Sequence, residues 1–181
     1  KFIGRQFSEL VVGVIGYGRL GTMYSKYSSS MGAKVLVYDP YKKVLDGNVS
    51  QVESLDEIFS DSNIISIHVH HNIETNKMLN EKCFNKMKSD VLLINTSRGE
   101  VFDEIDLVNF LKNNNDSKVA VDVISDEIKG NESSALRAYS KFSNQVLITP
   151  HIGGMTQEAQ EIAYNHAALM LERYIKLKIG N

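Results

Sequence analysis

Short apolar runs alternate along this chain with segments in which apolar residues recur every three or four positions. The runs predict strands at Val11–Ile15, Val35–Tyr38, Ile64–Val69, Val91–Ile94, Val119–Ile124 and Val146–Ile148, with a short strand at Val49–Val52. The helical spacing predicts helices at Leu20–Met31, Leu55–Ser60, Glu81–Lys88, Asp103–Leu111 and Thr156–Leu177. This alternation indicates an α/β fold: a doubly wound parallel sheet with helices on both faces, in three layers.

Capping residues define several helix ends. Gly32 follows the first helix as a C-cap glycine would. Ser54 and Glu57 have the spacing of a capping box, and Asn80 precedes the third helix as an N-cap. The last helix is long, and we expect one stripe of it to be buried, formed by Ala159, Ile162, Ala163, His166, Ala167, Met170, Tyr174 and Leu177.

Three glycines follow the first strand with the spacing G-x-G-x-x-G. Gly16 allows a tight turn, Gly18 leaves room for a pyrophosphate, and Gly21 lets the next helix pack close to the strand. The N-terminus of that helix offers free N–H groups to phosphates. Asp39 ends the second strand, where a carboxylate binds ribose hydroxyls and repels a 2′-phosphate. The segment predicts a dinucleotide site that favours NAD over NADP, the alternative being a structural glycine turn in another α/β protein.

Composition narrows the classes of protein. A chain of 181 residues with 43% hydrophobic residues can bury one sizeable core. Its net charge of −2, with both signs interspersed, favours neither nucleic acid nor a membrane surface as a partner. The single cysteine, Cys83, excludes an internal disulfide and fits a reducing compartment, so we expect a cytoplasmic protein in which Cys83 is a packing residue.

The start of the chain suggests a longer protein. No signal peptide or span-length apolar run is visible. Lys1 is not an initiator residue, and only Lys1–Leu10 precede the first strand. We therefore expect an excised segment.

Chemically useful side chains cluster at the predicted strand ends, where ligands of parallel sheets bind. They are His68, Arg98, Asp122 and His151, with Glu127 shortly after Asp122. A guanidinium binds a carboxylate through two parallel hydrogen bonds. A histidine can exchange a proton with a hydroxyl, and a nearby carboxylate favours its imidazolium form. Each residue alone also has an ordinary structural explanation, but together they favour a site for a carboxylate-bearing substrate.

Four stretches resemble the NAD-binding, Rossmann-type domain of the D-isomer-specific 2-hydroxyacid dehydrogenases, the family that includes phosphoglycerate and D-lactate dehydrogenases. They are GYGRLG at Gly16–Gly21, INTSRGEVFDE at Ile94–Glu104, VDVISDE at Val121–Glu127 and TPHIGGMTQEA at Thr149–Ala159. The resemblance implies that residues 1–181 form one NAD-binding domain. It also implies an NAD-dependent oxidoreductase that interconverts a D-2-hydroxy acid and its 2-oxo acid.

The same resemblance implies roles for individual residues. Arg98 would bind the substrate carboxylate, His151 would be the acid/base, and Glu127 would pair with His151. Asp122 would lie near the nicotinamide carboxamide. The positions implied to contact the cofactor are Gly16, Gly18, Arg19, Leu20, Gly21, Asp39, Val69, His70, Thr75, Thr96, Ser97, Arg98, Asp122, His151, Gly153 and Gly154.

Two departures from the family pattern affect these expectations. His70 and His71 follow Val69 where the family usually has proline, which puts the contacts of that loop in doubt. Adjacent histidines without a third ligand are weak evidence for metal, so we expect none. Ile128 replaces a proline common after the glutamate, within a predicted polar, mobile loop at Ser125–Ser133.

The family's second, substrate-binding domain is largely absent from this chain. We therefore expect NAD(H) binding with little or no turnover by the chain alone, and no assignment of the particular 2-hydroxy acid. The resemblance also implies a homodimer through this domain, for which the apolar residues of Ser133–Phe142 are candidates. An alternative function is a non-enzymatic, dimerising NAD(H) sensor that resembles transcriptional corepressors of the same fold.

Overall fold

The computed structural model describes residues 4–125, 127 and 134–179, except for the side chain of residue 179. It divides into two units, Lys1–Ile148 and Thr149–Asn181. The first unit contains the sheet and its covering helices. The second contains a short segment and one long helix.

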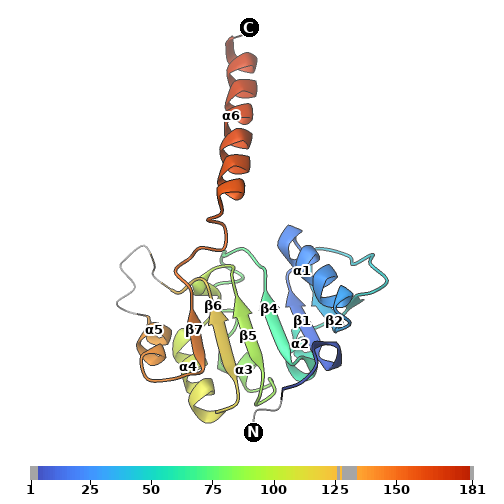
Figure 1. Cartoon of the computed structure of the whole chain (residues 1–181), viewed down its shortest axis with the longest axis vertical. Coiled ribbons are helices and arrows are strands. Elements are labelled where there is room, and N and C mark those ends of the chain that lie inside the picture. Colours follow the sequence, from blue (N-terminus) through green and yellow to red (C-terminus); the bar gives the residue numbers. More distant parts are fainter. Residues whose placement is uncertain (1–3, 126, 128–133, 180–181) are drawn as a thin grey trace. The chain divides into compact units, whose positions relative to one another are not determined.

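The first unit is built on a seven-stranded, all-parallel sheet (Figure 1). Its strands are β1 (Val11–Ile15), β2 (Lys34–Tyr38), β3 (Ser50–Gln51), β4 (Ile64–Ile67), β5 (Leu92–Asn95), β6 (Lys118–Val121) and β7 (Val146–Ile148). Their spatial order is β3-β2-β1-β4-β5-β6-β7. The order reverses between β1 and β4, and such a reversal forms a ligand crevice at the carboxyl ends of the strands.

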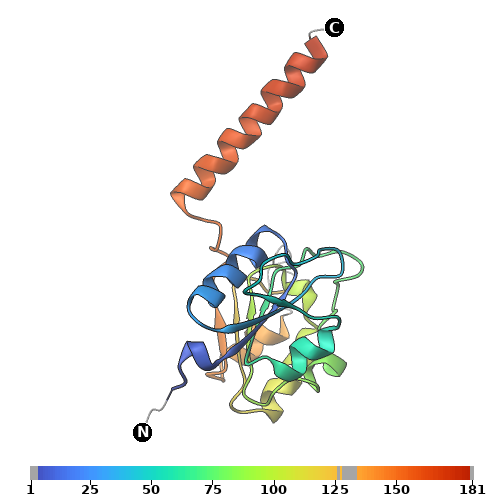
Figure 2. The ribbon, with the colours of Figure 1, turned by 90° about the vertical axis from the view of Figure 1, so that its right-hand side faces the viewer.

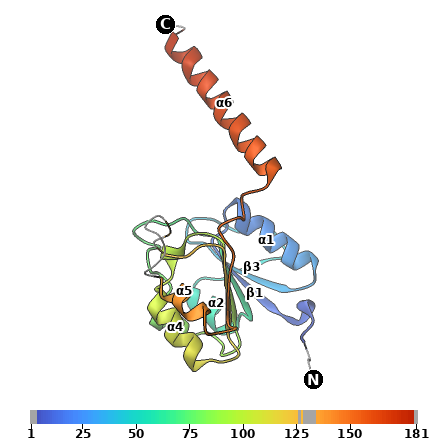
Figure 3. The ribbon, with the colours of Figure 1, turned by 60° about the vertical axis from the view of Figure 1, so that its left-hand side comes forward.

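Helices cover both faces of this sheet, as the sequence predicts. They are α1 (Arg19–Ser30), α2 (Leu55–Asp61), α3 (Glu81–Phe84), α4 (Glu104–Asn113) and α5 (Ala135–Ser140). Short 3-10 turns occur at Phe7–Glu9 and Gly99–Val101. Figures 2 and 3 show α1 on one face and α2 on the opposite face, together with α4 and α5 in Figure 3.

Two hydrophobic clusters, one on each face, form the core. The larger joins the sheet to α2–α5, with Phe59, Phe84 and Leu107 at most 1% exposed. The smaller lies under α1 and includes Val12 and Val14, both 0% exposed. Because the central strands are covered on both sides, their sequences are continuously apolar rather than alternating.

The face of α1 that packs on the sheet consists of small residues. Gly21, Ser25 and Ser28 are buried there, and the Ser25 hydroxyl donates to the carbonyl oxygen of Gly21 (2.8 Å). Four large apolar residues of the helix and its C-cap are 49–64% exposed; these are Leu20, Met23, Tyr27 and Met31. Tyr24 is partly buried and packs against the cluster under the helix. The periodicity correctly predicts the helix, but most of its apolar stripe does not face the core.

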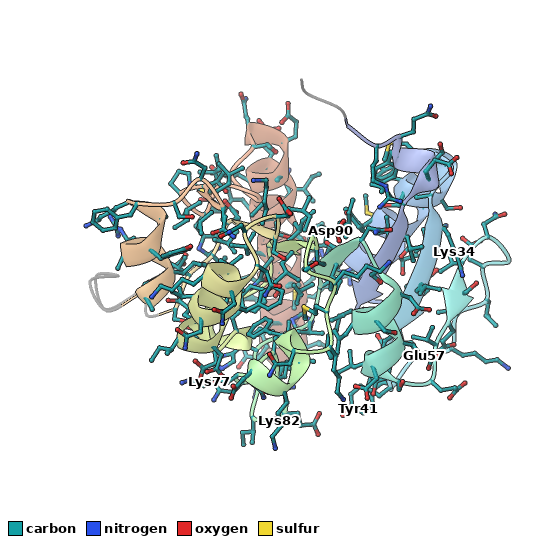
Figure 4. The ribbon with its side chains drawn as sticks, turned by 90° about the horizontal axis from the view of Figure 1, so that it is seen from below. Lys34, Tyr41, Glu57, Lys77, Lys82 and Asp90 are labelled. Carbon is teal, nitrogen blue, oxygen red and sulfur yellow. The ribbon has the colours of Figure 1, made fainter. Side chains whose placement is uncertain are left out.

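Most predicted caps are present. The Ser54 N–H donates to Glu57 Oε1 (3.1 Å) in a capping box; Figure 4 labels Glu57. The Asn80 side chain accepts from the Lys82 N–H at the start of α3. Gly32 adopts φ 91° directly after the C-cap residue of α1, as a C-cap glycine does.

Some predicted boundaries are wrong. α3 ends at Phe84 rather than Lys88, because the next hydrogen bonds tighten: Met87 N–H donates to the Phe84 carbonyl (3.0 Å). β4 ends at Ile67 and β6 at Val121, earlier than predicted. In both, the apolar run continues past the strand: Val69 lies in the loop after β4, and Val123 and Ile124 are buried beyond β6.

The second unit contains α6 (Gln157–Ile179), where the sequence predicts a long helix. The Thr156 hydroxyl accepts from the Ala159 N–H (3.1 Å) at its start. Within this unit taken by itself, the predicted stripe is uncovered: Ile162, Met170 and Tyr174 are 58–70% exposed. The reason is that this unit offers α6 no second element to pack against. No helix among the described residues is both long and apolar enough to span a membrane.

Part of the predicted loop at Ser125–Ser133 lies outside the described residues. Of that loop, the structure describes Ser125 and Glu127. The family departure at Ile128 is therefore among the residues left undescribed.

Candidate functional site

The glycine turn after β1 has the geometry its spacing predicts. Gly16 has φ 93°, and its N–H donates to the carbonyl oxygen of Tyr38 (2.9 Å). A Cβ on Gly21 would collide with the carbonyl oxygen of Gly16, so α1 packs directly on the turn. A Cβ on Gly18 would meet no atom within 4 Å, which leaves space for a ligand at the N-terminus of α1.

The Asp39 carboxylate connects the end of β2 to this turn. Its Oδ2 accepts from the Tyr17 N–H (2.7 Å), and its Oδ1 accepts from the Tyr41 N–H (2.9 Å). Each carboxylate oxygen retains acceptor capacity for a further donor. Asp39 is therefore oriented beside the turn, where it can accept hydrogen bonds from ribose hydroxyls.

A cavity of about 530 Å³ lies between the glycine turn and the loops after β2 and β4. The predicted cofactor residues that line it are Gly16, Gly18, Arg19, Asp39, Val69, His70 and Thr75. Two predicted residues of the glycine turn do not line it: Leu20 is 64% exposed, and a Cβ on Gly21 would meet the backbone of the turn. The predicted residues after β5 and β6 are not among its lining residues either, namely Thr96, Ser97, Arg98 and Asp122. The cavity has the size expected for part of a dinucleotide.

Two lining residues that the sequence does not predict form another part of the cavity wall. Tyr41 and Glu74 both line it, and the Tyr41 hydroxyl donates to Glu74 Oε2 (2.5 Å). This bond raises the pKa of Tyr41 and joins the loop after β2 to the loop after β4. The only signal in the sequence is the position of Tyr41, two residues after Asp39.

The loop with the unusual histidines is held by its own side chains. Asn72 Oδ1 accepts from the N–H groups of Glu74 and Thr75 (2.8 and 3.0 Å). The Thr75 hydroxyl donates to the carbonyl oxygen of His70 (2.6 Å). Among the described residues, no three His, Cys, Asp or Glu side chains form a group that could hold a metal.

His68 forms part of the cavity floor. Its Nε2 lies 2.9 Å from the Ser66 hydroxyl, and its ring packs on Tyr24 with centroids 5.2 Å apart. Burial lowers the pKa of His68 to about 4. The imidazole is therefore neutral near pH 7 and suits a structural role better than proton transfer.

A buried asparagine shapes the turn that carries Arg98. Asn95 is 0% exposed; its Oδ1 accepts from the Ser97 N–H (2.9 Å), and its Nδ2 donates to the Arg98 carbonyl oxygen (2.9 Å). The Arg98 guanidinium donates to the Ser97 carbonyl oxygen (2.6 Å), and its side chain is exposed. Thr96 is exposed beside it.

The ends of β5 and β6 bring the predicted substrate-side residues to neighbouring positions. The Asp122 N–H donates to the Asn95 carbonyl oxygen (3.0 Å), and Asp122 is 7% exposed. A Cβ on Gly99 would collide with the backbone of Ile124, so the Arg98 turn packs against the β6 exit. Glu127 Oε1 accepts from the Ile124 N–H (3.1 Å).

The remaining predicted residues, His151, Gly153 and Gly154, lie in the second unit. His151 has φ 54°, in the left-handed region that is uncommon for residues other than glycine, and its N–H donates to the Thr149 carbonyl oxygen (3.0 Å). The pairing of His151 with Glu127 stays a prediction from the family resemblance.

The parallel sheet, the glycine turn and the carboxylate at the end of β2 together define a dinucleotide-binding α/β domain. A family profile described as "D-isomer specific 2-hydroxyacid dehydrogenase, NAD binding domain" matches residues 1–153. The chain therefore belongs to the D-isomer-specific 2-hydroxyacid dehydrogenase family and contains its NAD-binding domain.

Individual relatives support this assignment. D-3-phosphoglycerate dehydrogenase of Escherichia coli (strain K12) is 40% identical over 150 residues, covering 83% of this chain and 36% of the relative. The crystal structure of D-lactate dehydrogenase from Aquifex aeolicus with NAD and lactic acid matches with a TM-score of 0.88 and 32% identity, covering 98% of this chain and 57% of that one. An acyclic imino acid reductase in complex with NADPH and D-Arg matches with a TM-score of 0.84 and 27% identity, over 98% of this chain and 54% of that one. The chain thus spans little more than a third of its curated relative and just over half of these structures.

Proposed function

We propose that this chain binds NAD(H) and serves an enzyme that interconverts a D-2-hydroxy acid and its 2-oxo acid. The observation that carries the proposal is the position of Asp39, whose carboxylate is held against the glycine turn at the wall of the cavity. The open space at Gly18 fits a pyrophosphate, and Asp39 fits an unphosphorylated ribose. The relatives that bind NAD and act on 2-hydroxy acids support the same assignment.

The substrate-side residues follow from the same proposal. A bound nicotinamide supplies or accepts the hydride at C2 of the acid. Arg98 binds the substrate carboxylate through its guanidinium. His151 exchanges a proton with the hydroxyl oxygen, and the Glu127 carboxylate favours the imidazolium form. Asp122 would hold the nicotinamide carboxamide, and Thr96 and Ser97 would hold the nicotinamide side of the cofactor.

The residues named above do not identify which 2-hydroxy acid is the substrate. The relatives named for phosphoglycerate and lactate both align with this chain over only part of their length. We therefore expect the chain alone to bind NADH and to turn over a 2-oxo acid slowly or not at all.

A titration of NADH and NADPH into the chain, followed by calorimetry, tests the cofactor assignment. Asp39→Asn is the informative variant, because it removes the charge while keeping the shape of the side chain and one acceptor oxygen, whereas Asp39→Ala removes the acceptors of both the Tyr17 and the Tyr41 N–H groups. We expect the native chain to prefer NADH by about tenfold or more. The Asp39→Asn variant should lose most of that preference, since it lacks the charge that repels a 2′-phosphate.

Asp46→Asn provides the matched control. Asp46 also accepts a backbone N–H, from Asn48 (3.0 Å), but it does not line the cavity. It should leave both affinities unchanged. Equal binding of NADH and NADPH by the native chain would contradict the assignment to NAD, a real alternative because one structural relative holds NADPH.

We also propose a homodimer, and the structure favours a different surface from the segment at Ser133–Phe142. Within that segment Leu136 is 1% exposed in its own core, and only Phe142 is a large exposed apolar side chain (89%) among the residues that the structure describes. The exposed stripe of α1, defined as Leu20, Met23, Tyr27 and Met31, is the larger apolar surface. Contiguous exposed apolar side chains of this kind mark interaction sites.

A further inference from the structure

The Glu104 carboxylate, at the first residue of α4, is buried and fully engaged. Glu104 is 8% exposed. Its Oε1 accepts from the Ser125 N–H (2.8 Å), and its Oε2 accepts from the Ser134 hydroxyl (2.7 Å) and the Leu136 N–H (3.2 Å). Because three donors bind this one buried carboxylate, Glu104 holds their positions in the interior and does not make an incidental surface contact.

The donors come from two separate parts of the chain. Ser125 lies at the exit of β6, whereas Ser134 and Leu136 lie at the start of α5. Glu127 belongs to the segment between them, and its carboxylate accepts from the Ile124 N–H, next to Ser125. Glu104 therefore fixes both ends of the segment that carries Glu127.

Stabilisation of α4 does not account for this arrangement. The N-cap of α4 is Asp103, whose carboxylate accepts from the N–H groups of Ile105 and Asp106. Asp106 adds a second acid to the first turn and accepts from the Glu81 N–H (3.0 Å). Glu104 makes its side-chain bonds to Ser125, Ser134 and Leu136, none of which belongs to α4.

We propose that Glu104 is a positioning residue that sets the placement of Glu127. The role rests on the proposed function, in which Glu127 acts on His151. Glu104 attaches Ser125 and Ser134 to the N-terminal end of α4, and the turn that begins at Arg98 leads along the chain into the same end of that helix.

Glu104→Gln tests the anchor without changing its shape. A glutamine has one acceptor oxygen and one donor amide, so whichever way it lies, its NH₂ faces a donor. We expect amide hydrogen exchange of Ser125 or Leu136 in the 181-residue chain to speed up by about tenfold or more, the factor for one lost charge-assisted hydrogen bond. Amides of β6, such as Val121, should keep their native rates.

The Ile124 amide reports on Glu127 itself. Its NMR shift should follow the titration of the Glu127 carboxylate in the native chain, and Glu127→Gln should abolish that response. In Glu104→Gln the response should fall to about half or less, because the bond between Ile124 and Glu127 is populated less. A purely structural role would leave it unchanged.

Asp106→Asn is the matched control, since it removes the same charge from the same helical turn and should change neither readout. If Glu104→Gln does not fold, Ser134→Ala removes one donor to Glu104, together with the hydroxyl that caps α5 at the Arg137 N–H. The readout is then the Ile124 titration, which should change in the same direction by a smaller amount. An unchanged Ile124 titration in every folded variant of Glu104 or Ser134 would overturn the proposal. These readouts need no cofactor, so a failure of NADH to bind would count against the proposed function and not against this role.

Discussion

The side chain of Asn95, fully buried at the end of β5, donates to the carbonyl oxygen of Arg98 at 2.9 Å. Its oxygen also accepts from the N–H and hydroxyl of Ser97 (2.9 and 2.7 Å). One amide thus closes the turn that presents the guanidinium. Arg98 is exposed, so its placement depends on this backbone turn rather than on packing of its own side chain.

Asn95→Ala should lower the free energy of unfolding by about 3 kcal/mol, because it removes three hydrogen bonds made by a fully buried side chain. Urea unfolding of the chain measures the change. Asn109→Ala, at an exposed position on α4, is the control and should stay within about 0.5 kcal/mol of the native value. A loss below about 1 kcal/mol for Asn95→Ala would mean that water replaces the lost bonds and that the turn does not depend on Asn95.

Two glycines of the turn after β1, Gly18 and Gly21, should respond differently to one added methyl group. Gly21→Ala should lower the free energy of unfolding by about 3 kcal/mol, because its Cβ collides with the Gly16 carbonyl. Gly18→Ala should leave stability nearly unchanged, since its Cβ enters open space and its φ of −69° suits alanine. Its methyl group should instead weaken NADH binding by about tenfold or more. Thermal unfolding and NADH fluorescence separate the two effects, and native NADH affinity in Gly18→Ala would place the pyrophosphate elsewhere.

The sequence alone supports the fold and the cofactor side of the site well. The strand–glycine–helix unit is local, so Gly16, Gly18 and Asp39 can be placed from spacing and turn chemistry. The apolar runs also identify the six longer strands, because the central strands are covered on both faces and need continuous apolar residues. The short edge strand β3, Ser50–Gln51, lies within the predicted strand Val49–Val52, although both of its residues are polar and exposed.

The polar groups that hold the site together could not be predicted in this way. Tyr41 and Glu74 meet across loops separated in sequence, and Glu104 reaches Ser125 and Ser134 from another element. No periodicity encodes such contacts. The apolar stripe of α1 also suggests a buried face that the structure does not have. A helix that packs closely on a glycine turn places small residues on its buried face, so most of its larger apolar residues lie on the exposed face.

The α1 stripe provides a test of the proposed homodimer. Replacing Met23 and Tyr27 together by lysine should shift the chain from dimer to monomer, because two charges would be buried in an apolar contact. Analytical ultracentrifugation measures the shift, and an unchanged Tm would show that the fold is intact, since both residues are exposed. Phe142→Lys is the control. Dissociation by Phe142→Lys alone would return the interface to Ser133–Phe142, and a monomeric native chain would contradict the dimer itself.

The buried imidazole of His68 should make the protein less stable in weak acid. Burial lowers the pKa of His68 from 6.5 to about 4, so between these values the unfolded chain binds the proton and the folded chain does not. The free energy of unfolding should therefore be unaffected by this group above about pH 6.5, fall as the pH falls towards 4, and lose at most about 3 kcal/mol in all. The groups that contact His68, Ser66 and Tyr24, are uncharged in this range and cannot compensate.

Urea unfolding at several pH values between about 4 and 7 measures this dependence. His68→Gln removes the titrating group while keeping a polar side chain near the Ser66 hydroxyl, so its stability should change less with pH than that of the native chain. His71→Gln is the matched control, because His71 is exposed and should leave the native slope intact. If the stability of the native chain and of His68→Gln depends equally on pH, His68 takes up its proton as readily in the folded state as in the unfolded state. Its role as a neutral residue of the cavity lining would then be wrong.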